Sequence, residues 1–174
     1  MIRLDTSDTV AAISSPQGES IRSIVRLSGP QCWAIAARMI RELPEKRPES
    51  ASAWSVETEA TETIPAFAGR LQFWPAGRSY TGQESIELHL DVPNVLAESV
   101  LRQCVSCGAR LAEPGEFSLR AFLLGRMDLT RAEAVAEIFQ ASNPDRMKVA
   151  LEQLAGGIGQ KIEKLRDRLL DLAR

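Results

Sequence analysis

The sequence contains no long apolar run and no recognisable targeting segment. Its first residues, from Met1 to Val10, are polar and carry Arg3, Asp5 and Asp8, which suits neither a signal peptide nor an Arg-rich transit segment. No apolar stretch approaches the roughly 20 residues that a transmembrane helix needs. We therefore expect a soluble, cytoplasmic protein that makes no membrane contact.

Clusters of basic residues and nucleotide-binding loops are also absent. The 21 Lys and Arg residues are balanced by 23 Asp and Glu residues, which gives a formal net charge of -2. Because non-specific affinity for nucleic acid comes largely from clustered Lys and Arg, this balance argues against a surface that binds RNA unaided. The G-x-x-x-x-G-K-[S/T] loop that holds nucleotide phosphates is missing, so the chain alone should not hydrolyse GTP.

Cysteine and histidine are scarce, with three cysteines and one histidine. Cys104 and Cys107 have the C-x-x-C spacing of metal and redox sites, but only Cys32 and His89 could complete a zinc site. The pair also falls in a strongly helical stretch. We therefore interpret both thiols as small apolar groups on a buried helix face, and expect no metal.

Short strand and helix patterns alternate in the first part of the chain. Strands are predicted at residues 10–13 and 24–27. The apolar residues from Trp33 to Leu43 then recur at helical spacing and predict a helix that ends before Pro44. Ser28 is expected to cap this helix.

Two alternating strands are predicted after a poorly patterned stretch. Residues 45–63 have little periodicity and predict a loop, anchored only by Trp54 and Val56. Residues 66–74 alternate between apolar and polar side chains, and so do residues 86–91. The side chains expected to point away from the core are Arg70, Gln72, Glu87, His89 and Asp91.

Helical patterns dominate the rest of the chain. Helices are predicted at residues 93–107 and 117–124, and Thr130 begins a capping box that predicts a third. Pro144 is expected to open a last helix, with a bend or a close helix contact at Gly156-Gly157. Its apolar stripe continues to the end of the sequence without a stop signal. Such an unpartnered stripe suits a homodimer seam or a fragment of a longer helical domain, and we favour the fragment.

These patterns together predict an α+β fold. We expect a mixed sheet with flanking helices over residues 1–125, followed by the beginning of an all-α helical domain over residues 126–174.

Four motifs then follow one another in a specific order. They are D-T-V-A-A at residues 8–12, V-R-L-S-G-P at 25–30, Y-T-G-Q-E at 80–84 and P-G-E-F-S-L-R-A-F at 114–122, the last running into D-L-T-R-A-E-A at 128–134. This order resembles the MnmE/TrmE family of tRNA-modification GTPases over nearly the whole chain, with residues 45–63 the weakest part.

The resemblance implies a folate-binding domain related to one-carbon enzymes. Such a domain would form a homodimer and hold 5-formyl- or methylene-tetrahydrofolate near the dimer interface. The complete protein would act with a flavin-dependent partner protein on the wobble uridine of certain tRNAs. GTP, Mg²⁺ and K⁺ would bind a GTPase domain that is absent from this sequence, and the family's reactive C-terminal cysteine motif has no counterpart here.

Three folate contacts of the family map onto Arg26, Glu87 and Arg126, and in the family the last is commonly lysine. The residue types suit the ligand, because one carboxylate can accept two adjacent N–H donors of a pterin edge and guanidinium groups suit the tail carboxylates. Each residue also has a plainer interpretation. Arg26 would be a solvated strand residue, Glu87 part of a polar strand face and Arg126 part of a helix-ending turn. His89 could act as a general base, but the family does not use this position in that way.

Two glycine-rich elements of the family are altered in this sequence. The loop after the first strand, of the type P-G-R-G-G-x-G, is replaced by residues 16–23 with a single glycine and with Glu19 where arginine is usual. The histidine and two glycines that follow the glutamate are replaced by Asp91, Val92 and Pro93. Because glycine allows a positive φ and a close ligand approach, both walls around the folate contacts should be remodelled.

Three hypotheses follow. The first is a folate-binding, dimerising part of a tRNA-modification GTPase. The second is a degenerate, non-catalytic dimerisation module that no longer binds folate, which the altered glycines favour. The third is a stand-alone folate-dependent one-carbon transferase, for which the sequence offers no convincing catalytic acid or nucleophile.

Overall fold

The computed structural model describes residues 5–16, 22–58, 60, 65–140, 143–155 and 159–172. The chain forms two compact units, Met1–Phe117 and Ser118–Arg174. The first contains a sheet with helices and the second is helical, so the predicted α+β fold class is confirmed. The functional domain boundary expected near residue 125 remains a prediction.

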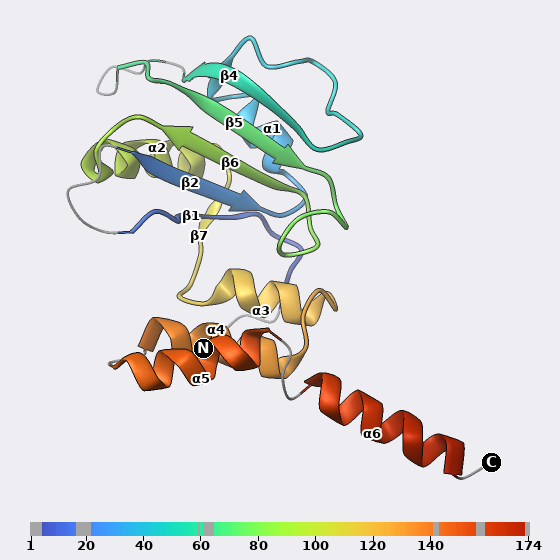
Figure 1. Ribbon diagram of the computed structural model, residues 1–174. Coiled ribbons are helices and arrows are strands. Elements are labelled where there is room, and N and C mark those ends of the chain that lie inside the picture. The colour runs from blue at the N-terminus through green and yellow to red at the C-terminus, as the bar shows by residue number, and fades with distance from the viewer. Residues whose placement is uncertain are drawn as a thin grey trace. The chain divides into compact units, whose positions relative to one another are not determined.

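The first unit is built on one mixed sheet (Figure 1). Among the described residues, seven strands lie in the order β3-β4-β5-β6-β2-β1-β7, and every neighbouring pair is antiparallel except β1 and β7. The strands are β1 (Val10–Ile13), β2 (Ser23–Ser28), β3 (Ile40–Arg41), β4 (Ser52–Thr58), β5 (Ala68–Trp74), β6 (Ser85–Leu90) and β7 (Arg110–Leu111).

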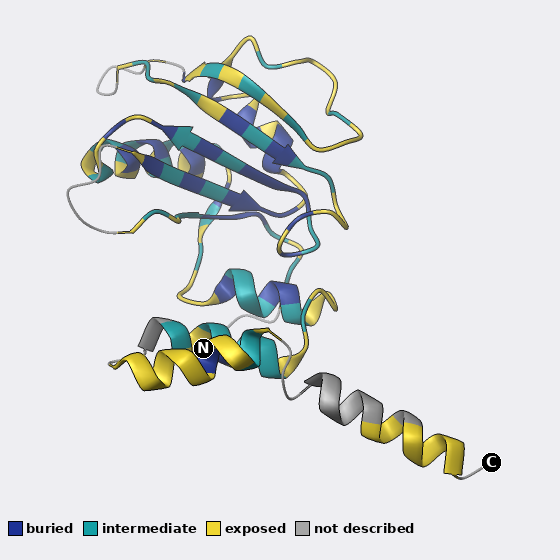
Figure 2. Ribbon diagram, viewed as in Figure 1, coloured by how far each residue is buried: buried dark blue, intermediate teal, exposed yellow. Residues whose placement is uncertain are grey.

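Two helices cover one face of this sheet (Figure 1). The buried residues of α1 (Cys32–Ala36) and α2 (Asn94–Ser106) share one apolar core with the inward residues of β1, β2, β5 and β6. Trp33 of α1 contributes aromatic contacts, with ring centroids 5.7 Å from Trp54 and 5.3 Å from Phe73. Along each strand, the residues between the inward ones point to the opposite face of the sheet. Many of these side chains are half-buried or exposed, so the burial alternates along the strands (Figure 2). We call this opposite side the open face.

Several elements match the sequence-based predictions closely. The first strand has the predicted bounds, Ile86, Leu88 and Leu90 point into the core, and α2 differs from the predicted helix by one residue at each end. Cys104 is fully buried in this core, and Cys107 packs against its edge. The interpretation as apolar packing on a buried helix face is therefore confirmed for Cys104, whereas Cys107 lies just after the helix and is half-buried.

Two features between residues 28 and 58 were predicted wrongly. Ser28 does not cap a helix but ends β2, and α1 covers only Cys32–Ala36, because the chain then turns and residues 40–41 pair with β4 as β3. The predicted loop contains the seven-residue strand β4, whose outward positions carry small or polar residues that weaken its apolar pattern. Trp54 and Val56 do pack against the core, so their role as anchors is confirmed.

The second unit is helical. The helix α3 (Glu116–Leu123) begins at the end of the first unit and is followed by α4 (Leu129–Gln140), α5 (Pro144–Leu154) and α6 (Gly159–Leu172). The helices α4 and α5 pack against each other, and each buries one alanine, Ala134 and Ala150. Among the described residues, no helix has both the length and the apolar character needed to cross a membrane.

Two predictions for this unit were wrong in detail. The helix α4 begins before Thr130, and its cap is Asp128, whose Oδ1 accepts the backbone N–H of Arg131 at 2.8 Å. The last helix is not continuous, since α5 ends at Leu154 and α6 starts at Gly159. The bend predicted at Gly156-Gly157 lies outside the described residues.

Candidate functional site

An ion pair between β2 and β6 lies on the open face of the sheet. The antiparallel register places Arg26 directly opposite Glu87. The Nε of Arg26 donates to Oε1 of Glu87 at 2.8 Å, and its NH2 lies 2.7 Å from the same oxygen. The side chains are only 29% and 16% exposed, so this pair is shielded from solvent more than an ordinary surface ion pair.

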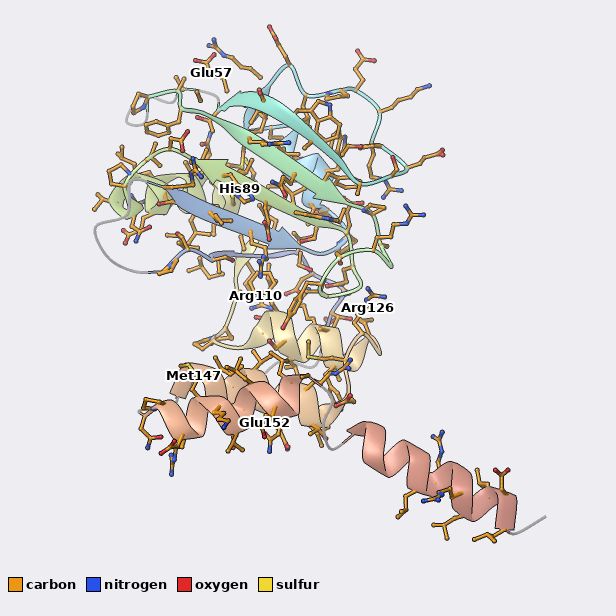
Figure 3. The ribbon with its side chains drawn as sticks, viewed as in Figure 1. Glu57, His89, Arg110, Arg126, Met147 and Glu152 are labelled. Atoms are coloured by element: carbon orange, nitrogen blue, oxygen red, sulfur yellow. The ribbon has the colours of Figure 1, made fainter. Side chains whose placement is uncertain are left out.

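The second oxygen of Glu87 contacts His89, which lies two residues further along β6 and therefore on the same face. The distance from His89 Nε2 to Glu87 Oε2 is 3.0 Å. Figure 3 labels His89 among the side chains of the sheet. Each carboxylate oxygen has two acceptor directions, so Oε2 of Glu87 keeps one for another donor, whereas Oε1 already faces both Nε and NH2 of Arg26.

Two aromatic rings flank the guanidinium of Arg26. Its central carbon lies 6.0 Å from the ring centroid of Tyr80 and 5.6 Å from that of Phe117. At these distances both rings attract the cation. The two rings come from the Y-T-G-Q-E and P-G-E-F motifs, so three of the four sequence motifs meet at this arginine.

The loop that carries Tyr80 is held by short polar contacts. The Oγ of Ser28 and the Oγ1 of Thr81 share a hydrogen bond of 2.7 Å, and the backbone N–H of Gly82 donates to Oγ of Ser79 at 3.0 Å. Glu84, the first acid after the Y-T-G turn, is buried and serves the fold. Its oxygens accept the backbone N–H of Trp33 at 3.0 Å and pair with Arg47 at 2.7 Å.

A second ion cluster holds the segment that carries Phe117. Arg110 pairs with Asp8 at 2.7 Å and with the buried Glu116 at 2.6 Å (Figure 3 labels Arg110). The hydrogen bonds from Glu116 and then Asp8 raise the pKa of Arg110 further above its ordinary value, so its charge is permanent. Glu116 also accepts the backbone N–H of Glu113 at 2.8 Å. The glutamate of the P-G-E segment, Glu116, therefore has a structural role in holding this part of the chain.

A cavity of about 520 Å³ lies on the open face beside the Arg26–Glu87 pair. His89 belongs to both, since it lines the cavity and contacts Glu87. Gln72 also lines it, directly opposite Glu87 on the neighbouring strand, and its half-buried amide makes no hydrogen bond within the described residues. The cavity is lined by Arg22, Ser55, Val56, Ala68, Gly69, Arg70, Gln72, His89 and Asp91.

The sequence patterns placed Arg70 and Gln72 on an outward strand face but did not identify them as candidates. The alternation along β5 was the available signal. It could not show that β5 lies next to β6 in the register that sets Gln72 beside Glu87 and Arg70 beside His89.

The third predicted folate contact, Arg126, lies in the turn that ends α3 in the second unit (Figure 3). Its backbone N–H donates to the carbonyl of Ala121 at 2.8 Å, and the preceding Gly125 has a φ of +69°. The side chain is exposed. The plainer interpretation of Arg126 as part of a helix-ending turn is therefore correct for its backbone, and its role toward folate remains a prediction.

The altered glycine elements are only partly described. Residues 17–21 lie outside the described residues. Val92 is buried in the helix-side core, Pro93 precedes α2, and Asp91 pairs with Arg22 at 3.1 Å. Because Val92 packs on the helix side of the sheet, it does not separate Arg26 from Glu87.

Metal chemistry has no candidate in the part of the chain that the structure describes. No three side chains of His, Cys, Asp or Glu gather there as a metal site. Burial raises the pKa of the Cys104 thiol to about 12, which makes it a poor nucleophile and a poor metal ligand.

Comparison with known proteins identifies the family. The family described as GTP-binding protein TrmE N-terminus matches residues 9–126. Proteins named tRNA modification GTPase MnmE are 41% identical over 169 residues in Rhodopirellula baltica and 40% identical over 165 residues in Aquifex aeolicus. These alignments cover 97% and 95% of this chain but only 36% of each relative, so the chain spans about a third of their length. The chain therefore belongs to the MnmE/TrmE family of tRNA modification GTPases and corresponds to its N-terminal region.

Proposed function

We propose that this chain is the part of a tRNA modification GTPase that binds a reduced folate and forms a homodimer. The observation that supports this proposal most directly is the partly buried Arg26–Glu87 pair on the open face, beside a cavity of about 520 Å³. The chain's membership of a family whose relatives are named tRNA modification GTPases supports the biological context.

Glu87 is the proposed receptor of the pterin. A pterin edge offers N–H donors that a carboxylate can accept. Arg26 faces Oε1 of Glu87 with two nitrogens and His89 contacts Oε2, so Oε2 keeps one acceptor direction for a pterin N–H. Arg26 holds the carboxylate in place, so it acts as a positioning residue. The amide of Gln72, which makes no hydrogen bond among the described residues, lies next to Glu87 and suits the neighbouring polar atoms of a pterin.

Arg126 is the third proposed contact. Its guanidinium is exposed, and its planar donors suit either the carbonyl oxygen of a pterin or a tail carboxylate. Bound 5-formyl- or methylene-tetrahydrofolate would supply a one-carbon unit. In the complete protein, a flavin-dependent partner protein would use that unit at the wobble uridine of tRNA, and GTP, Mg²⁺ and K⁺ would bind a GTPase domain outside this sequence.

Isothermal titration with 5-formyltetrahydrofolate tests the proposal. We expect the wild-type chain to bind, and Glu87→Gln to bind at least roughly tenfold more weakly, because a charge-assisted hydrogen bond contributes about 1.5–3 kcal/mol. Glu98→Gln is the matched control, since Glu98 is an exposed glutamate on α2, the helix that covers the other face of the sheet. No heat with the wild type, or equal binding by Glu87→Gln, would show that Glu87 does not bind folate.

A degenerate dimerisation module without folate binding is the second candidate. It is favoured by the Asp91-Val92-Pro93 segment, where a buried side chain and a proline replace the glycines of the family. A dimer in light scattering combined with no folate binding would support this candidate, whereas a monomer would exclude it.

A further inference from the structure

One arginine on the open face is available for an anion. Arg70 on β5 is exposed, lines the cavity and makes no hydrogen bond or ion pair within the described residues. The other arginines of this face are already paired, Arg22 with Asp91 at 3.1 Å and Arg26 with Glu87 at 2.7 Å. The cavity lining therefore carries two arginines against one aspartate, a formal charge of +1 before His89 is counted.

The register of the sheet arranges these groups in rows across the strands. Gln72 lies opposite Glu87, and Arg70 lies opposite His89 in the next row. Because a strand rises about 3.3 Å per residue, successive rows on one face are about 7 Å apart. The Arg22–Asp91 pair forms one further row in the same direction. A ligand held at Glu87 that extends along β5 and β6 therefore passes Arg70 first and Arg22 next.

The walls of the cavity suit an aromatic linker that ends in carboxylates. Ala68 is small and apolar and lies on the same face as Arg70, so a flat ring can lie against it, while the Arg70 guanidinium can donate two parallel hydrogen bonds to one carboxylate. His89 joins the two regions, since it contacts Glu87 and lines the cavity.

We propose that this cavity receives the p-aminobenzoyl-glutamate tail of the folate, and that Arg70 binds a tail carboxylate. This inference rests on the proposed folate-binding function and adds the direction in which the ligand lies. It assigns the tail to the cavity between β4, β5 and β6 and leaves Arg126 for another part of the ligand.

The test compares two ligands by isothermal titration with the 174-residue chain. One is 5-formyltetrahydrofolate, and the other is the primary amide of 5-formyltetrahydropteroate, in which a neutral amide replaces the glutamate and no carboxylate remains. We expect the wild type to prefer the first by roughly tenfold, the effect of one charge-assisted contact. Arg70→Gln should reduce this ratio to near one and leave the affinity for the amide ligand unchanged. Arg70→Glu should make the amide ligand the better one.

Two control variants separate Arg70 from other arginines. Arg102→Gln removes an exposed arginine from α2 on the covered side of the sheet and should keep the wild-type ratio. Arg126→Gln should also keep the ratio, even if it weakens both ligands together. Thermal unfolding of each variant checks that the fold is intact.

The outcomes distinguish this inference from the proposed function. A wild type that binds both ligands equally, or an Arg70→Gln variant that keeps the preference, overturns the tail assignment alone. Loss of the preference in Arg126→Gln but not in Arg70→Gln also overturns it and moves the tail to Arg126. A wild type that binds neither ligand overturns the folate function and the tail assignment together.

Discussion

At the residue scale, the central feature is a carboxylate whose two oxygens have different partners. Oε1 of Glu87 is held by Arg26, and Oε2 contacts His89. The environment of Glu87 also contains Gln72 opposite on β5, while His89 faces Arg70 across the same two strands. This arrangement keeps a partly buried charge oriented without using all of its acceptor capacity.

The Arg26–Glu87 pair should be visible in the stability of the protein. Replacing Arg26 by Met leaves Glu87 without its cation, so we expect the free energy of unfolding to fall by about 1–3 kcal/mol in urea denaturation. The double variant Arg26→Met/Glu87→Gln should recover part of this loss, because the orphaned charge is removed. Equal stability of the single and double variants would mean that the orphaned charge costs nothing measurable.

The buried thiols should make stability fall at alkaline pH. Burial raises the pKa of Cys104 to about 12, and it raises the pKa of Cys32 as well. An unfolded thiol titrates near pH 8.5, so the stabilisation is complete below that pH and is lost as pH rises toward the folded pKa. Between about pH 9 and 11, each buried thiol should lower the free energy of unfolding by about 1.4 kcal/mol per pH unit. Urea unfolding at several pH values should show that the free energy of unfolding of Cys104→Ala falls less steeply with pH than that of the wild type, by the amount that one thiol contributes. An identical pH dependence in the two proteins would contradict the effect of burial on the Cys104 thiol.

At the element scale, short strands and turns bring the motifs together. The turn after β2 is the most constrained of them. Gly29 has a φ of +141°, and a Cβ there would lie 2.5 Å from the carbonyl oxygen of Asp8 and 2.5 Å from Cα of Thr9. This close approach explains why the V-R-L-S-G-P motif needs glycine directly after the strand that carries Arg26.

Two glycine variants separate steric crowding from backbone strain. Gly29→Ala should destabilise the fold by more than about 2 kcal/mol, because a positive φ and a backbone clash act together. Gly77 is the matched position, since it has a φ of +81° and nothing within 4 Å of the added Cβ. Gly77→Ala should therefore cost only about 1 kcal/mol. Thermal or urea unfolding of both variants measures the difference, and equal losses would refute the crowding at Gly29.

At the scale of the whole molecule, the first unit carries the proposed folate site on an open sheet face and the second unit is helical. The helices of the first unit cover the sheet on one side only, so its polar side chains face outward on the other. With a formal net charge of -2, the chain has no overall excess of cationic side chains that would favour non-specific binding to nucleic acid.

Light scattering in solution tests the expected dimer. We predict a particle of twice the chain mass of 19.1 kDa, because the family resemblance implies a dimer through this region. The measurement should be repeated over a dilution series, since a dimer dissociates by mass action. A monomer at every concentration would contradict both the folate-binding dimer and the degenerate dimerisation module.

Local patterns predicted part of this protein well. Alternation placed Leu88 inward and Glu87 outward on β6, helical spacing predicted α2, and motif order identified the family. These features depend on residues close together in the chain. The same reasoning failed for β3 and β4, because strands with small or polar outward residues are recognised only by the strands they pair with.

What the sequence by itself determined was the fold class, the family and the outward face of each recognised strand. Only the tertiary structure decided which outward residues are neighbours. The register between β2, β5 and β6 brings Arg26, Glu87 and Gln72 into one row, although they are far apart in the chain. Strand pairing is a long-range interaction that no local pattern encodes, so the cavity and the place of Arg70 beside it became visible only in three dimensions.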